Sequence, residues 1–280
     1  MADLPIARVL ASLTDRVAAM DGGTPASYIP VLADADPDWF GMALVMMDGH
    51  GYSAGESDRR FTIQSVSKPF VFGLVLDAQG PEAVGRRVGV EPTGDPFNSI
   101  AVEETTRRAH NPMVNAGAIV AASMVPGGTL EDRWAWLRAG FERFVGHPLD
   151  FCESTFASEQ ATGDRNRAIA WFMRAFQMLP ADVDDVLDLY FRQCSLLVSA
   201  EDLAVMAATL ANGGVNPATG ERALSAESTV RVLSVMTMCG MYDFSGEWMY
   251  RVGLPAKSGV SGGVLAVAPG QLGFAVFSPP

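Results

Sequence analysis

Ser65 and Lys68 lie three residues apart at the start of the apolar run 69–76. On a helix such residues share a face, so the serine hydroxyl and the lysine amine can meet. A serine is a weak nucleophile until a neighbouring base takes its proton, and a lysine can be that base where burial lowers its pKa. The pair indicates acyl-transfer chemistry, with Ser65 as the nucleophile and Lys68 as the general base.

A helix cap is the alternative interpretation of the same segment. Ser65 or Ser67 can cap a helix that begins near Lys68, which would then be solvated, and Pro69 suits a first helical turn. Val66 and the apolar run favour a buried lysine instead. A serine at a helix N-terminus also lies near backbone N–H groups, which stabilise a developing oxyanion. The segment alone leaves both interpretations open.

A second motif, Lys257-Ser258-Gly259, comes late in the chain. In serine acyl-transfer enzymes of the penicillin-binding class, S-x-x-K is partnered by a late K-T-G-type triplet on a strand at the sheet edge. Here the triplet follows Ser65 by roughly 190 residues and lies in a region of predicted strands. A surface turn is the alternative, because glycines cluster over 259–263.

The elements that must position these motifs follow from the periodicity of apolar residues. A helix is predicted over 5–20, and strands over 40–47, around Tyr52 and over 60–63. The middle of the chain is helical, over 113–124, 130–144, 165–178, 182–194, 200–212 and 226–238. Short strands return over 248–252, 260–268 and 273–277. Strands at both ends predict one antiparallel sheet, with a helical layer inserted between its halves.

The composition argues against several classes of function. The 280 residues are 49% hydrophobic and carry a formal net charge of −12, which disfavours a nucleic-acid partner. No apolar stretch reaches the length of a membrane span, and residues 1–16 show no export signal. The scattered cysteines and histidines predict no metal site, and the few cysteines favour a reducing cytoplasm.

Longer stretches of sequence narrow the chemistry. The chain resembles the serine-dependent glutaminases, whose fold is α/β, of the α+β and β-lactamase/transpeptidase-like type, over nearly all of 28–278. The resemblance rests on YIP at 28–30, FTIQSVSKPF at 61–70, VGVEPTGDPFNS at 88–99, NPMVNAGAI at 111–119, SEQATGDRN at 158–166, CSLLVSAEDLA at 194–204, LANGGVNPATG at 210–220, CGMYDFSGEW at 239–248 and GLPAKSGVSGG at 253–263.

The resemblance implies hydrolysis of L-glutamine to L-glutamate and ammonia, without a metal or cofactor. Ser65 matches the nucleophile and Lys68 the general base. Two tyrosines that contact the substrate and help to move the proton match Tyr190 and Tyr242. Further substrate-binding positions match Tyr28, Asn115, Glu159, Asn166 and Val260. Among these, Glu159 and Asn166 would hold the amino-acid end of glutamine, and the Val260 N–H would join that of Ser65 in an oxyanion hole.

Each of three implied site residues also has a purely structural interpretation. Glu159 beside Asp164 and Arg165 can form a surface ion pair. Asn115 can cap a helix, and Tyr190 can be a core side chain. Two other functions are alternatives at this point: another S-x-x-K hydrolase, such as a β-lactamase, peptidase or esterase, and a catalytically silent glutamine-binding protein.

We expect one domain over 1–280, with a sheet part over about 1–65 and 240–280 and a helical part over about 66–239. The resemblance implies a homo-oligomer, either a dimer or a tetramer. It also implies a further segment and a final helix on the sheet, which would follow the S-P of Ser278-Pro279. Without them we expect a bare apolar sheet face, or one that a neighbouring subunit covers.

Overall fold

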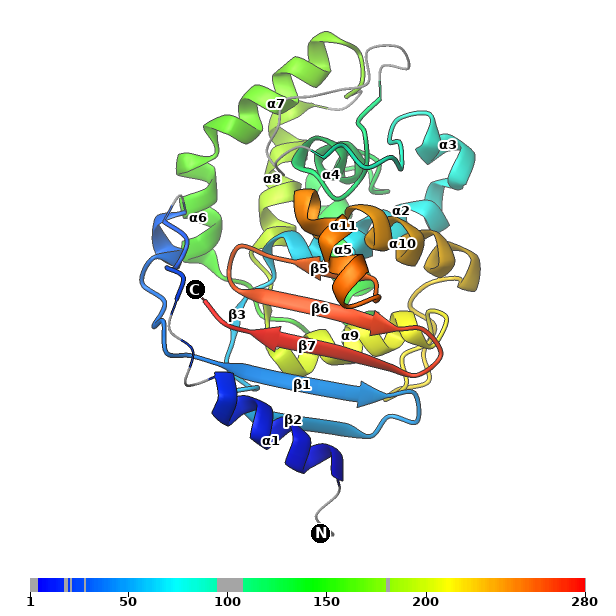
Figure 1. Ribbon diagram of the computed structural model, residues 1–280. Coiled ribbons are helices and arrows are strands. Elements are labelled where there is room, and N and C mark those ends of the chain that lie inside the picture. The colour runs from blue at the N-terminus through cyan, green and yellow to red at the C-terminus, as the bar shows by residue number, and fades with distance from the viewer. Residues whose placement is uncertain are drawn as a thin grey trace.

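A five-stranded antiparallel sheet is assembled from both ends of the chain (Figure 1). The computed structural model describes residues 5–17, 20, 22–27, 29–94, 108–179 and 182–279. The sheet has the order β2-β1-β7-β6-β5. Its strands are β1 (Gly41–Met46), β2 (Gly51–Gly55), β5 (Ala256–Ser258), β6 (Gly263–Ala268) and β7 (Leu272–Phe277). The predicted sheet of early and late strands is confirmed.

One face of this sheet packs on helix α9 (Ala200–Ala211). Alternation places Ala43 and Val45 of β1 opposite Ala275 and Gly273 of β7, and all four are buried on the helix side. Gly273 must lack a side chain, because a Cβ there would lie 2.1 Å from a backbone nitrogen of α9. The small residues therefore let the helix lie close to the middle of the sheet.

The strand expected over 60–63 does not join the main sheet. β3 (Phe61–Thr62) pairs instead with β4 (Leu197–Val198) in a separate two-stranded sheet. The backbone N–H of Ile63 continues this pairing by donating to the Leu196 carbonyl at 2.8 Å. This small sheet fixes the chain immediately before the 3-10 turn η2 (Gln64–Ser67), which carries Ser65.

The remaining helices form the upper part of the molecule and the edges of the sheet (Figure 1). Helix α2 is buried over residues 68–76 and packs Phe70 against Phe144 of α5, with ring centroids 4.9 Å apart. A helix that is apolar all round lies in a core. The helices are α1 (Pro5–Val17), α2 (Lys68–Gln79), α3 (Pro81–Gly85), α4 (Asn115–Ser123), α5 (Leu130–Val145), α6 (Glu153–Thr162), α7 (Asp164–Ala175), α8 (Val183–Cys194), α10 (Ala226–Cys239) and α11 (Ser245–Arg251).

One sequence expectation about these elements was wrong, and one short strand was missed. The segment 248–252, predicted as a strand, belongs to α11, where Arg251 pairs with Glu247 one turn earlier and the Trp248 indole donates to the Leu254 carbonyl. Strand β5, which carries Lys257 and Ser258 of the late triplet, was not predicted as a strand of its own. Three residues are too few for a periodic signal. The start of α9 is as predicted, with Ser199 and Asp202 forming a capping box.

Candidate active site

Ser65 sits in a strained turn at the entrance to α2. Gln64, the residue before it, has a φ of 49°, in the left-handed region that non-glycine residues rarely adopt. The Ser67 hydroxyl donates to the Gln64 carbonyl at 2.7 Å and closes the turn. Ser65 is half-buried here, directly before a helix N-terminus. The backbone thus presents the hydroxyl where helix N–H groups favour negative charge.

Lys68 is the first residue of α2, and it is buried rather than solvated. Its side chain is 1% exposed. Its Nζ donates to the Met113 carbonyl at 3.1 Å and to Oδ1 of Asn115 at 2.7 Å. Burial lowers the pKa of Lys68 to about 7, although its interactions with Cys194 and Glu159 act in the opposite direction. Near neutral pH a large share of Lys68 is therefore an uncharged amine, the form that can accept a proton.

Tyr242 connects these two residues from the far end of the chain. It opens the 3-10 turn η3 (Tyr242–Phe244) with a φ of 57°. Its hydroxyl is hydrogen-bonded to Ser65, while burial raises the pKa of Tyr242 well above its usual value. The Lys68 Nζ lies 5.6 Å from the centroid of its ring. The Tyr242 phenol is therefore protonated at neutral pH and lies next to both Ser65 and Lys68.

Asn115 and Asn166 come together from two helices. Asn115 opens α4, and its Nδ2 donates to Oδ1 of Asn166 in α7 at 2.9 Å. The turn before α4 is closed by Asn111, whose Oδ1 accepts the N–H of Met113 at 3.0 Å. Gly117 permits this turn, because a Cβ there would lie 1.9 Å from the Asn111 carbonyl oxygen. Asn115 makes no side-chain cap bond. Its amide oxygen accepts from Lys68 instead, and its amide nitrogen donates to Asn166.

Glu159 lies inside α6 and is buried, which rules out the surface ion pair. Burial raises the pKa of Glu159 to about 7, while a hydrogen bond with Gln64 and the charge of Lys68 lower it. Its Oε1 has no hydrogen-bond partner in the described part of the chain. A buried carboxylate oxygen without a partner is costly unless a ligand donates to it. Glu159 is therefore suited to accept a cationic group such as an α-ammonium.

Tyr190 reaches this cluster through Cys194, one turn later in α8. The two side chains are hydrogen-bonded, and Cys194 is close enough to Lys68 and Glu159 to interact with their charges. Burial is the main cause that raises the pKa of Cys194, so its thiol stays neutral. Tyr190 is 3% exposed, which fits the core interpretation as well.

The loop after β5 is attached to the Ser65 segment on both sides of Val260. Gly259 lies against Val66, since a Cβ there would be 3.0 Å from the Val66 side chain. The Ser261 hydroxyl donates to the Thr62 carbonyl at 2.6 Å. Val260 is held between these two contacts, so its backbone lies beside the turn that carries Ser65. Tyr28, the remaining expected site residue, lies outside the described residues.

Comparison with known proteins shows to which family the chain belongs. The sequence matches the family described as Glutaminase over residues 23–280. The chain belongs to the glutaminase family. A glutaminase of Trichormus variabilis is 49% identical over 276 residues, covering 99% of this chain and 83% of the relative. A glutaminase of Microcystis aeruginosa is 50% identical over 275 residues, covering 98% of this chain and 81% of the relative.

Solved glutaminase structures agree with the fold. The probable glutaminase ybaS superposes with a TM-score of 0.91 at 41% identity, covering 98% of this chain and 90% of that one. Mglu in its glutamate form gives a TM-score of 0.95 at 44% identity, covering 99% of this chain and 64% of that one. The expected α+β fold of the β-lactamase/transpeptidase-like type is confirmed, and the chain is an enzyme of the glutaminase class, which hydrolyses glutamine.

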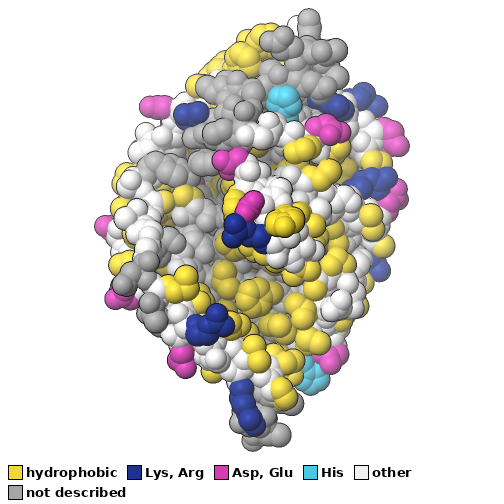
Figure 2. Space-filling view, in the orientation of Figure 1, with side chains coloured by type: hydrophobic (Ala, Val, Ile, Leu, Met, Phe, Trp, Pro, Cys, Tyr) yellow, Lys and Arg dark blue, Asp and Glu magenta, His cyan; other side chains and the backbone are white. Residues whose placement is uncertain are grey.

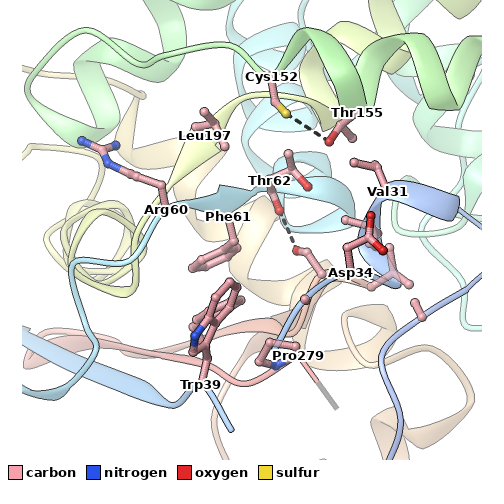
Figure 3. A pocket seen from close by; sticks show the side chains of 16 residues that line it. Val31, Asp34, Trp39, Arg60, Phe61, Thr62, Cys152, Thr155, Leu197 and Pro279 are labelled. Carbon is pink, nitrogen blue, oxygen red and sulfur yellow. Dashed lines mark hydrogen bonds between the residues drawn. The ribbon is translucent and has the colours of Figure 1, made fainter. Parts of the chain in front are cut away.

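An apolar pocket of about 230 Å³ adjoins the candidate site without containing Ser65 (Figure 3). Val260 and Ser261, in the loop after β5, line this pocket, whereas Ser65 and Lys68 do not. Figure 3 shows Phe61, Trp39 and Leu197 around it, with Cys152 hydrogen-bonded to Thr155 at one edge. This pocket is therefore separate from the cluster that holds Ser65.

Sequence reasoning missed two side chains of this candidate site and assigned no role to a third. Gln64 contacts Glu159, and Cys194 joins Tyr190 to the charged cluster. The sequence identified Lys257 only as part of the late triplet. In the structure its Nζ lies 3.8 Å from the centroid of the Tyr242 ring. For Gln64 the available signal was its place directly before the nucleophile. No sequence signal placed Cys194, since its neighbours come from distant segments.

Among the described residues no helix is long and apolar enough to cross a bilayer. The same part of the chain contains no cluster of three or more His, Cys, Asp or Glu residues that could bind a metal ion.

Proposed function

We propose that the chain hydrolyses the side-chain amide of L-glutamine through an ester on Ser65, with Lys68 as the general base. The observation that supports this most is the buried Lys68 amine, whose pKa of about 7 makes it a base near neutral pH. Tyr242, hydrogen-bonded to Ser65, would pass the proton between the two residues. Tyr190 would act with Tyr242 around the reacting amide.

The amino-acid end of glutamine would be held by polar side chains deeper in the site. Glu159 offers its unpaired Oε1 to the α-ammonium group. Asn115 and Asn166 offer amide N–H groups to the α-carboxylate, and they are already joined by a hydrogen bond. A relative crystallised in its glutamate form supports a site that accepts the product. Tyr28 is proposed as a further contact on the basis of the family resemblance alone.

The chemical steps balance without a cofactor. Ser65 Oγ attacks the side-chain amide carbon and gives its proton to Lys68, while the N–H groups of Ser65 and Val260 stabilise the oxyanion. The C–N bond then breaks, and the leaving nitrogen takes the proton and departs as ammonia. Water, deprotonated by Lys68, hydrolyses the resulting ester and regenerates Ser65. The sum is glutamine plus water giving glutamate plus ammonia.

Substrate competition tests the proposal against its rivals. We expect ammonia release from L-glutamine and no acylation by a β-lactam or a peptide ester. If hydrogen bonds hold the amino-acid end in place, the side-chain amide of L-asparagine, one methylene shorter, lies farther from Ser65. L-asparagine should therefore react more slowly. Glutamine binding without ammonia release would identify a silent binding protein and refute the proposed turnover.

We further propose one domain over 1–280 and a homo-oligomer, either a dimer or a tetramer. The sheet face opposite α9 carries half-buried apolar side chains over its middle strands, and Figure 2 shows an apolar area there. These side chains are Leu44, Met46, Leu272, Phe274 and Val276. Apolar patches of this kind favour burial against another subunit. Sedimentation that gives only monomer at micromolar concentration would contradict the oligomer.

A cytoplasmic location is proposed from the cysteines. Cys152, Cys194 and Cys239 are all free thiols, and unpaired cysteines are the rule in a reducing compartment. Fractionation of the native host would test this.

A further inference from the structure

Lys257 is a second buried lysine in the site, and the proposed mechanism does not use it. It lies in β5 at the sheet edge and is 0% exposed. Its Nζ donates to the carbonyl of the next residue, Ser258, at 2.6 Å. Burying an amine costs free energy, so a site that keeps one is expected to use it.

The amine of Lys257 lies against the ring of Tyr242. The Nζ is 3.8 Å from the ring centroid, compared with 5.6 Å for Lys68. The residue before it, Ala256, meets the same turn: a Cβ on Gly240 would lie 1.8 Å from the Ala256 carbonyl oxygen. Ala256 of β5 therefore contacts the backbone at Gly240, and the next residue, Lys257, contacts the ring of Tyr242.

Tyr242 needs such support. Its φ of 57° is unfavourable for a residue with a side chain, and such strain persists only where the surroundings fix it. The turn is also closed by Ser245, whose hydroxyl donates to the Tyr242 carbonyl at 2.8 Å. That bond fixes the backbone, whereas the Lys257 amine is placed to fix the ring that carries the hydroxyl.

We propose that Lys257 is a positioning residue for glutamine hydrolysis, which holds the Tyr242 ring so that its hydroxyl stays on Ser65. The proposal rests on the proposed role of Tyr242. Burial and the charge of Lys68 lower the pKa of Lys257 well below its usual value. The geometry lets the amine donate N–H groups to the Tyr242 ring and to the Ser258 carbonyl.

A double-mutant cycle tests this role. Lys257→Met keeps the aliphatic stem and removes the amine, and Tyr242→Phe keeps the ring and removes the hydroxyl. We expect Lys257→Met to lower kcat for glutamine about 100-fold, with KM changed less than about threefold, because only proton transfer is disturbed. In the Tyr242→Phe background the same change should lower kcat less than about threefold, because no hydroxyl is left to position.

Leu265, which pairs with Lys257 across β6, supplies the matched control. Leu265→Met alters the same buried location without touching the amine, and it should leave kcat unchanged. If Lys257→Met does not fold, as judged by its melting curve, Lys257→Leu takes its place in the cycle.

The outcomes separate the two proposals. Equal losses of kcat in both backgrounds, or no loss in the presence of Tyr242, would overturn the positioning role and leave the proposed mechanism intact. Full activity of Tyr242→Phe alone would refute the role of Tyr242, and with it the role of Lys257.

Discussion

The amine of Lys68 donates to the amide oxygen of Asn115 at 2.7 Å. Because Asn115 also donates to Asn166, the base of the proposed Ser65 reaction and the residues proposed to bind the amino-acid end of glutamine form one hydrogen-bonded unit. Substrate binding and the protonation state of Lys68 are therefore expected to influence each other.

The pH dependence of kcat/KM should follow the protonation of Lys68. Below its pKa the residue is an ammonium ion and cannot accept the Ser65 proton, and burial places that pKa at about 7. Activity should therefore rise as the pH increases through about 7 and then level off. A profile that is flat between about pH 6 and 8 would contradict this assignment of the base.

The part of the pH profile in which activity rises with pH is its acid limb. Asn115→Asp should move this acid limb to higher pH. A carboxylate in place of the amide, beside the Lys68 Nζ, would stabilise the ammonium form and raise the pKa of Lys68 by at least about one unit. Asn115→Ala is the matched control, since it removes the acceptor without adding charge. It should raise KM without an upward shift of the limb. Rate measurements across the pH range distinguish the two variants.

Glu159→Gln should move the acid limb of the pH profile to lower pH. The negative charge of Glu159 raises the pKa of Lys68, so its removal lets Lys68 lose its proton at lower pH. Loss of the charged partner for the α-ammonium should raise KM for glutamine at least about tenfold. Glu153→Gln, at an exposed position of the same helix, should change neither quantity. An unchanged KM for Glu159→Gln would refute the binding role.

Ser261→Ala should weaken the oxyanion hole without touching the nucleophile. The lost hydrogen bond to the Thr62 carbonyl is one of the two contacts that hold Val260 beside Ser65. We expect kcat to fall about tenfold, less than for loss of an oxyanion donor itself. Thr229→Val removes another buried hydroxyl bond, in α10, and serves as the control for general destabilisation. Equal activity losses in both variants would contradict a specific effect.

Local sequence patterns predicted much of this fold because the signals were strong. The apolar neighbours of Lys68 favoured a buried side chain over a solvated one, and the start of α9 followed from its capping box. Helix α6 was missed, because it buries only Thr155 and Glu159 and so has no apolar stripe. The residues over 248–252 were wrongly predicted as a strand, since a single turn of helix and a short strand have similar apolar patterns.

The site itself depended on contacts that no local pattern encodes. Ser65 and Tyr242 meet although they lie far apart in sequence, and Cys194 approaches Lys68 only because α8 packs beside η2. The family resemblance named most of the polar residues that the structure brings together. It did not single out the amine of Lys257 against the Tyr242 ring, which requires the packing of β5 on the turn after α10.

The most direct test of the account is the ammonia released from L-glutamine by Ser65→Ala compared with the unaltered chain. Removal of the nucleophile should reduce kcat by at least about 1,000-fold while the variant keeps its melting temperature and still binds glutamate. A folded Ser65→Ala enzyme that releases ammonia at the original rate would contradict the Ser65 ester, and with it the role assigned to Lys68.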